Sequence, residues 1–313
     1  MQYILKRIIL LIPLLLAITF LSFAMMRIAG SDVVEQKMLN TGQVVSETQL
    51  KMAKEELGLN SPFLVQYFRW LKNLLHGDMG VSYVSGKDVF ETFISKLPAT
   101  IWLTISSIVF TIIISIPLGI ISAIYQNKFI DYLIRFFSFI GNSLPNFFVS
   151  LVLMYILSIR LGWLPIISKE VSATSIIMPT LTLAIAMSSK YLRQVRATVL
   201  DELNKDYVVG AKARGVNFST TLIFSVMKST LVTIITLLAL SIGSLLGGTA
   251  IVESIFMWDG VGKMAVDAIN MRDYPIIQAY VMWMAIIYVL VNLVTDISYQ
   301  FIDPRIRLGD RKQ

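Results

Sequence analysis

Residues 99–125 read ATIWLTISSIVFTIIISIPLGIISAIY, and this apolar stretch without a charged side chain decides the class of fold. A helix needs about 20 predominantly apolar residues to cross the hydrocarbon core of a bilayer. Because lipid offers no hydrogen-bond partners, a spanning backbone must satisfy its own amides, as a helix does. No part of the chain shows the alternation over about ten residues that is typical of a membrane barrel strand. The sequence therefore predicts an all-α integral membrane protein.

Other apolar stretches surround this one and bring the prediction to six transmembrane helices. They lie approximately at residues 8–26, 133–157, 176–189, 231–252 and 276–298. The stretch at 176–189 is short for a complete span. The first stretch follows Lys6 and Arg7, as the core of a signal peptide does. It is longer than the usual core of about 7–15 residues and no small-residue cleavage site follows it, so it is interpreted as an uncleaved helix.

The composition agrees with a membrane protein and excludes several kinds of site. Hydrophobic residues make up 56% of the chain and charged residues 15%, against roughly 25% charged in soluble domains. The chain has no cysteine and one histidine, His76, so it can build neither a disulfide nor a thiolate or multi-histidine metal cage of its own. The net charge of +7 is spread over several loops, which argues against nucleic acid as a partner.

The lysine and arginine residues between the spans predict the orientation in the membrane. With the N-terminus inside, fifteen of them lie in the cytoplasm and four lie in short external loops. Both termini are therefore expected in the cytoplasm, with a long external helical segment between the first two helices. The predicted divisions are a first transmembrane helix at 1–29, an external segment at 30–98, and a five-helix core at 99–313 with a cytoplasmic loop at 190–229.

The external segment carries its own helix signals. Ser46-Glu47-Thr48-Gln49 is a capping box, and Leu57-Gly58 ends the helix that it begins. Ser61-Pro62 begins a second helix, which carries an apolar stripe over Phe63–Leu75 and ends at Gly77. Two compatible interpretations are an amphipathic helix on the outer rim of the bundle and a vestibule that receives a substrate-binding protein.

The loop at 190–229 is long, polar and basic. Its residues from Asp201 to Arg214 are compatible with a helix, and Gly215 is a natural stop. Asn217 or Ser219 can cap a second short helix that leads into the next span. These residues by themselves leave two interpretations open, a docking surface for a cytoplasmic partner or a solvated connector whose charge holds it inside.

Motifs along the whole chain point to one family. The longest are LGLNSPFLVQYFRWL at 57–71, GDMGVS at 77–82 and GGTAIVESIFMWDGVG at 247–262. Shorter ones are SLPNFF at 143–148, GWLP at 162–165, RDYPIIQ at 272–278 and DPR at 303–305. Together they resemble the permease subunits of peptide/nickel ABC importers, of the first-permease type. One departure is Asp259, which stands where that family usually has proline.

The resemblance implies a transport subunit that is not an enzyme and binds no cofactor itself. It implies partners that comprise a second homologous permease subunit, two ATPase subunits carrying ATP and Mg²⁺, and an extracytoplasmic substrate-binding protein. It also implies a multi-pass location in the lipid bilayer of the bacterial cytoplasmic (inner) membrane. Gly262-Lys263-Met264 forms no nucleotide-binding loop of this chain's own, because the spacing and the Ser or Thr after the lysine are missing.

The same resemblance implies candidate site residues. Those expected to couple to the ATPase are Asp206, Tyr207, Ala211, Ala213, Arg214 and Gly215. Those expected at the external gate or the binding-protein side are Glu253, Trp258, Gly260, Gly262 and Asp273. The general family pattern is Glu-Ala-Ala, three residues, then Gly. Aligned on Gly215, these positions are Val209, Gly210 and Ala211, so the coupling glutamate is absent.

Pro145 can break the third predicted span, and Asn142 and Asn146 flank it one helical turn apart. The two amides could line a polar stripe on one helix face. Such a stripe favours hydrogen bonding between helices, and the alternative is a translocation path that includes Asn142, Pro145 and Asn146.

The motifs favour nickel or another transition metal, carried as a chelate from an external binding protein, as the substrate. The GGTAIVE block at 247–253 and the Val261–Val266 stretch look closer to nickel-type permeases, although the chain offers no metal ligand set of its own. The alternative is a di- or oligopeptide importer of the same family. A remote alternative is an ion-coupled secondary carrier, which would carry charged residues near mid-span and inverted repeats; neither is evident.

Overall fold

The computed structural model describes residues 2–29, 52, 55, 60–167 and 171–302. Its contacts divide the chain into two compact units, Met1–Pro98 with Gly260–Leu290, and Ala99–Asp259 with Val291–Gln313. Most of the described residues are helical, and the only β pairing among them is an isolated antiparallel bridge between Val81 and Asp88. The capping box predicted at 46–49 and the helix end predicted at 57–58 lie outside the described residues.

Within the described residues, the first unit contains four helices. They are α1 (Gln2–Ala29), α4 (Phe63–Leu75), α12 (Val261–Met271) and most of α13 (Tyr274–Ile302), together with the first turns of α5 (Val89–Ile124). Its aliphatic core joins the residues after α4 to α12 and α13, and Phe93 stacks on Trp283 with ring centroids 5.1 Å apart. The segment from Met79 to Val89 is therefore held both by packing against α12 and α13 and by the bridge between Val81 and Asp88.

Helix α4 forms as its sequence predicts. Pro62 is the residue immediately before its first turn, and Gly77 follows its end with a φ of +85°. Its aromatic side packs edge-on against α1, where the Tyr67 ring lies 5.3 Å from that of Phe20. The Tyr67 hydroxyl is 3.0 Å from the hydroxyl of Thr19. The opposite side of α4 is exposed and partly apolar, as an amphipathic helix requires.

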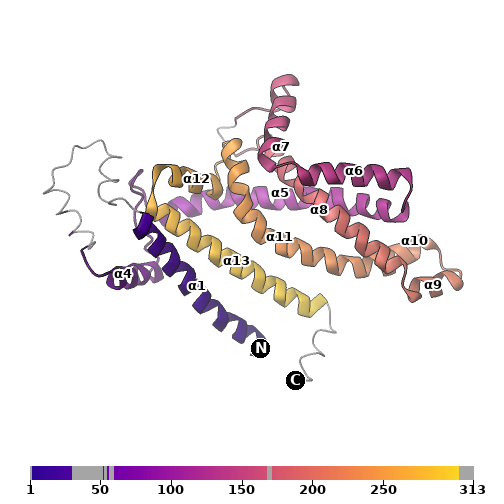
Figure 1. Cartoon of the computed structure of the whole chain (residues 1–313), viewed down its shortest axis with the longest axis horizontal. Helices are drawn as coiled ribbons and strands as arrows, with labels where there is room; N and C mark the ends of the chain where they lie inside the picture. The colour runs from indigo at the N-terminus through magenta and orange to yellow at the C-terminus, as the bar shows by residue number, and fades with distance from the viewer. Residues whose placement is uncertain (1, 30–51, 53–54, 56–59, 168–170, 303–313) are drawn as a thin grey trace. The chain divides into compact units, whose positions relative to one another are not determined.

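The second unit contains the remaining helices in chain order (Figure 1). They are α5, α6 (Phe129–Ser143), α7 (Asn146–Leu153) with the π-helical turn Met154–Arg160, α8 (Ile177–Leu203), α9 (Asp206–Ala213), α10 (Phe218–Thr221) with the π-helical turn Leu222–Val226, and α11 (Met227–Ile255). α8 is the central element, because α6, α7 and α11 all pack along it. Close approach is needed at Gly141, where a Cβ atom would lie 2.2 Å from the Ser189 hydroxyl.

The third predicted span is not one helix. α6 and α7 are bent by 104° at the break between them. Pro145 has no amide to donate and disfavours helical geometry in the residue before it, and Leu144 accordingly has extended backbone angles of −84° and 130°. The prediction of a single span at 133–157 was therefore wrong in shape, while the expectation that Pro145 can break it is confirmed. Pro117, in contrast, lies inside an unbroken α5.

Three helical segments among the described residues are long and apolar enough to cross a membrane. They are Val89–Ile124, Phe218–Leu238 and Tyr274–Val294, and the bent pair α6 and α7 makes a fourth if it is one span. The apolar part of α1, Ile12–Met25, is shorter. The chain is therefore a membrane protein whose described residues are mostly helical, with several candidate spans, and the total of six and the side of each terminus stay predictions.

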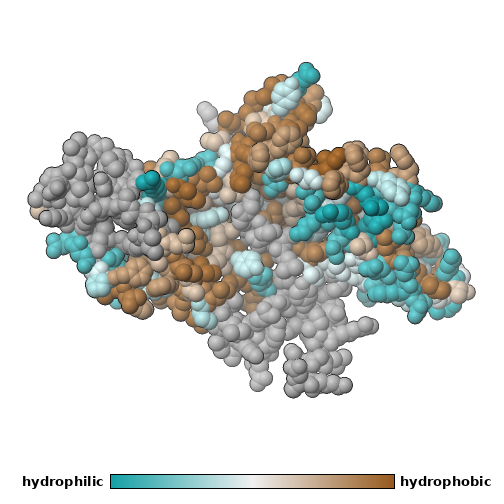
Figure 2. Space-filling view, in the orientation of Figure 1, coloured by the Kyte–Doolittle hydropathy of each residue, from teal (hydrophilic) through white to brown (hydrophobic). Residues whose placement is uncertain are grey.

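The surface carries large apolar areas of the kind that lipid or partner subunits cover. Figure 2 shows hydrophobic surface over α6 and hydrophilic surface over the C-terminal half of α8 and over α9. On α6 the exposed side chains include Phe129, Phe136, Phe137 and Phe139. The second unit therefore has one polar end, and that end carries α9.

Candidate functional site

The polar end of the second unit is built on the last turns of α8. This helix continues through the first part of the predicted loop to Leu203, and α9 begins at Asp206. The sequence from Asp201 to Arg214 was predicted as helix-compatible, and it forms two helices because Lys205 takes an extended conformation with ψ of 150°. α9 is therefore a separate short helix that α8 presents at its end (Figure 1).

The Glu202 side chain holds the connection between α8 and α9 in place. The Tyr207 hydroxyl donates a hydrogen bond of 2.8 Å to Glu202 Oε2, and Lys205 Nζ lies 2.5 Å from Glu202 Oε1. Burial, followed by the hydrogen bond and the negative charge of Glu202, raises the pKa of Tyr207 to about 12. The phenol therefore stays protonated, and remains a donor, at physiological pH. Glu202 was not among the residues predicted from the sequence, although its spacing of three and five residues to Lys205 and Tyr207 is a usable signal.

The far end of α9 terminates in a Schellman motif. The Gly215 amide donates to the Lys212 carbonyl at 3.0 Å, and the Val216 amide donates to the Ala211 carbonyl at 3.1 Å. Gly215 has a φ of +78°, a conformation that glycine adopts without strain. The predicted stop at Gly215 is therefore confirmed. The cap of α10 is Asn217, whose side chain accepts a hydrogen bond from the Ser219 amide at 3.1 Å.

The six residues predicted to couple to the ATPase have two different environments. Ala211 is buried against the body of the unit. Tyr207 is half-exposed, and exposed positions are held by Asp206, Ala213, Arg214 and Gly215. Val209, which stands where the family has glutamate, is 61% exposed. The exposed positions of this segment are therefore mixed in character, with the charged Asp206 and Arg214 beside Ala213 and Gly215, while Ala211 is buried.

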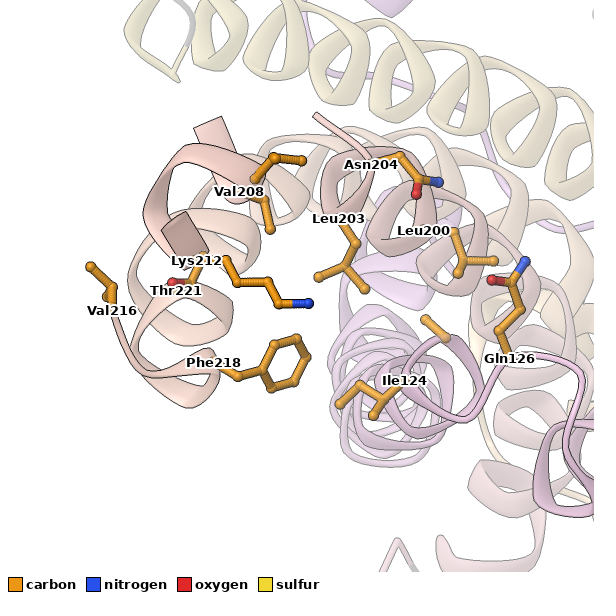
Figure 3. Close-up of a pocket in the computed structure, with 12 residues that line it drawn as sticks. Ile124, Gln126, Leu200, Leu203, Asn204, Val208, Lys212, Val216, Phe218 and Thr221 are labelled. Atoms are coloured by element: carbon orange, nitrogen blue, oxygen red, sulfur yellow. The ribbon is translucent and has the colours of Figure 1, made fainter. Parts of the chain in front are cut away.

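An open cavity of roughly 790 Å³ lies behind α9. Its lining comes from the ends of α5 and α8 and from α9 and α10, and it is largely apolar. In Figure 3 the Lys212 side chain extends into this cavity between Leu203 and Phe218. α9 and α10 therefore enclose this cavity together with the ends of α5 and α8.

A buried ion pair ties the α5–α6 turn to α8. The Asp131 side chain is fully buried and accepts two hydrogen bonds from Arg196, at 2.8 and 2.7 Å. It also accepts the Ser122 hydroxyl at 2.5 Å and the Asn127 amide at 2.9 Å. All four lone-pair directions of the carboxylate are thereby used, which is the condition for burying a charge without a large penalty. Neither residue of this pair was predicted from the sequence.

The residues predicted for the external side are divided between the two units. In the second unit, Thr100 donates a hydrogen bond of 2.8 Å to the buried carboxylate of Glu253, and Trp258 Nε1 donates to the Ala99 carbonyl at 3.0 Å. These bonds hold the part of α5 around Ala99 and Thr100 to the end of α11. They give Glu253 and Trp258 a packing function, and a function toward a binding protein stays a prediction.

In the first unit, Gly260 precedes α12 and Gly262 is buried within it. Asp273 is also buried, and it accepts hydrogen bonds from the Ser82 hydroxyl at 2.5 Å and the Tyr83 amide at 3.0 Å. Asp273 therefore holds the segment after α4 to the α12–α13 turn. Its contact with a binding protein likewise stays a prediction.

Asn142 and Asn146 do not share a helix face. Asn142 lies in α6 and Asn146 begins α7, and the sharp bend at Pro145 separates them. The argument for one polar stripe was wrong, because it assumed that the helix continues through the proline. A place for Asn142, Pro145 and Asn146 on a translocation path stays a prediction.

Replacing Thr100 by valine is expected to lower the free energy of unfolding by about 1–3 kcal/mol, because the buried Glu253 carboxylate loses a donor. Thr100→Ser keeps the hydroxyl and is the matched control. Thermal unfolding of the purified protein in detergent measures both. Equal stability of the valine and serine variants would show that this hydrogen bond contributes nothing.

Comparisons with known proteins agree with the motifs. Residues 115–308 match the family model described as "Binding-protein-dependent transport system inner membrane component". Residues 1–104 match the model "Binding-prot-dependent transport system membrane comp, N-term". The chain therefore belongs to the binding-protein-dependent transport family and is a permease subunit of the peptide/nickel ABC importer type.

Two relatives illustrate the similarity within the family. The chain is 39% identical to the oligopeptide transport system permease protein AppB of Bacillus subtilis (strain 168), over 97% of this chain and 98% of that protein. It is 35% identical to the glutathione transport system permease protein GsiC of Salmonella typhimurium (strain LT2), over 98% of this chain and 99% of that protein.

Solved structures share the fold at low sequence identity. An inward-facing conformation of the MetNI methionine ABC transporter has a TM-score of 0.57 and 14% identity, covering 67% of this chain and 96% of the solved chain. An amino acid ABC transporter crystallised with histidines has a TM-score of 0.53 and 16% identity, covering 67% and 94%. The ABC permease fold is therefore present in about two thirds of the chain.

Proposed function

We propose that this chain is the first permease subunit of a peptide importer, with small peptides as the substrate class. Its relatives are named for oligopeptides and for glutathione, and glutathione is itself a short peptide. The two names therefore describe one class of substrate. The nickel substrate that the motifs favoured finds no support among these relatives, so the peptide alternative is preferred.

The observation that carries the mechanistic part of the proposal is the geometry of α9. A short helix with a glycine stop is held at the end of α8 through Glu202, with Ala211 buried and with Asp206, Ala213 and Arg214 exposed away from the cavity lining. We infer that its outer surface docks into an ATPase subunit. Closure of the ATPases would push on α9, and the long α8 would pass the motion to the bundle as a rigid body.

The proposal includes the partners and the topology that this mechanism requires. They are a second homologous permease, two ATPase subunits with ATP and Mg²⁺, and an external binding protein that delivers the peptide. The chain would cross the bacterial inner membrane six times, with both termini and α9 in the cytoplasm. In this arrangement the acidic and aromatic groups around Glu253, Trp258 and Asp273 lie on the outer side.

Deleting the gene for this chain is expected to abolish high-affinity uptake of a labelled tripeptide and to leave uptake of ⁶³Ni²⁺ unchanged. Re-expression of the full chain restores uptake, and a host that lacks the partner ATPases is the control for ATP dependence. Loss of nickel uptake with normal peptide uptake would overturn the substrate assignment. Peptide uptake that persists without the ATPases would instead favour the ion-coupled carrier.

A further inference from the structure

A second open cavity of roughly 980 Å³ lies between α6 and α8, at the same polar end of the second unit. Gln126 lines both this cavity and the one behind α9. The residues that matter for its chemistry are Tyr132, Arg135, Phe136, Phe139, Arg193 and Arg196. Three guanidinium groups and three aromatic rings therefore share one hollow on the surface.

Two of the three arginines that line the cavity form no ion pair within the described part of the chain. Arg196 is neutralised, because both oxygens of Asp131 are bonded to it. Arg135 and Arg193 are exposed, and neither forms an ion pair with a carboxylate of the described residues. The Arg135 guanidinium lies 5.7 Å from the centre of the Tyr132 ring, which orients it without cancelling its charge. Two arginines are therefore available to an anion.

Tyr132, Phe136 and Phe139 form an aromatic wall of the cavity. This wall indicates that a bound anion also carries an apolar part. Phe136 and Phe139 line the cavity and are 59% and 65% exposed. They continue into Phe129 and Phe137, which are also exposed on α6. Leaving this apolar surface in contact with water costs about 25 cal/mol of free energy for each Å² that could be buried. A free phosphate ion would use the arginines and leave the aromatic wall in water.

We propose that this cavity binds an anionic glycerophospholipid, with its phosphodiester on Arg135 and Arg193 and its acyl chains along the aromatic side of α6. The planar guanidinium fork matches phosphate oxygens, and basic pockets between helices on the cytoplasmic side are suited to acidic headgroups. The inference rests on the proposed topology, which places this end of the unit at the cytoplasmic leaflet. The lipid would brace α6 against α8, the helix that presents α9.

The test uses the complete transporter, purified with its partner subunits and reconstituted with phosphatidylglycerol, or with phosphatidylcholine as the neutral reference. Native mass spectrometry counts the retained lipids, and a lipid titration gives the relative affinity. Each basic group near the surface contributes roughly fivefold for an anionic lipid. The double variant Arg135→Gln with Arg193→Gln is therefore expected to lower the preference for phosphatidylglycerol by roughly 25-fold.

The matched control is Lys190→Gln with Lys228→Gln, which removes two exposed positive charges outside the cavity. It is expected to keep the preference. Equal loss in both double variants would mean unspecific surface charge and would overturn the proposal. Crosslinks that place an ATPase or second-permease residue in the cavity would also overturn it. Because lipid retention is read without any transport, a wrong peptide assignment would leave this result unchanged.

Discussion

Replacing Gly215 by valine is expected to reduce ATP-driven uptake by about tenfold or more, while the chain still inserts into the membrane. Gly215 has a φ of +78° and nothing lies within 4 Å of the position where a Cβ would stand. The damage is therefore conformational and not steric. A left-handed conformation costs an ordinary residue about 1–2 kcal/mol, and a β-branched residue more. Relaxing that strain breaks the Schellman motif and turns the end of α9 away from its partner.

Two control variants separate this effect from general damage. Gly215→Asn is expected to retain most uptake, because asparagine tolerates the left-handed region. Gly210→Ala lies within α9, where the added Cβ would meet only the Arg214 side chain at 3.6 Å, and it is expected to be neutral. Uptake and peptide-stimulated ATPase activity are measured together in proteoliposomes. Normal coupling in Gly215→Val would refute the docking function of α9.

Replacing Arg196 by alanine is expected to destabilise the protein by about 3–5 kcal/mol, because it leaves a fully buried carboxylate without its counter-ion. Asp131→Ala is expected to be comparably damaging, since it removes the acceptor of Arg196, Ser122 and the Asn127 amide at once. The two losses are not additive. The double variant, which buries no unpaired charge, is expected to recover a large part of the stability.

The measurement is a double-mutant cycle on the purified protein, with unfolding followed by heat or denaturant in detergent. Lys190→Ala, an exposed cation on the same helix, is the control and is expected to change stability by less than about 0.5 kcal/mol. Single variants as stable as the control would show that the pair does not hold the α5–α6 turn to α8. A double variant no better than either single one would show that packing, and not charge, decides the loss.

Local features of the fold could be predicted well from the sequence. The apolar stripe of α4, its end at Gly77, the stop of α9 at Gly215 and the possible break at Pro145 all follow from backbone preferences of a few neighbouring residues. The family could be recognised because its motifs are spread along the whole chain. The prediction of one straight span at 133–157 was wrong because hydropathy measures only how apolar a segment is and does not report a bend.

The candidate site was predicted only in part. The sequence identified the segment from Asp206 to Gly215, but not which of its residues face outward. That division depends on the partner of Tyr207 and on the burial of Ala211. The Asp131–Arg196 pair joins residues that are 65 positions apart, and the Thr100–Glu253 bond joins residues 153 apart. Nothing in the local sequence of either partner identifies the other.

The class of this protein follows from its amino-acid sequence, because an apolar segment in lipid forms a helix and because helix ends obey local rules. Which buried charges are paired, how sharply a span bends and which residues of α9 are exposed depend on how the helices pack. A buried charge and an exposed surface are defined by the groups that surround them. Those surroundings come from helices that lie far apart in the chain, so they exist only once the helices have packed.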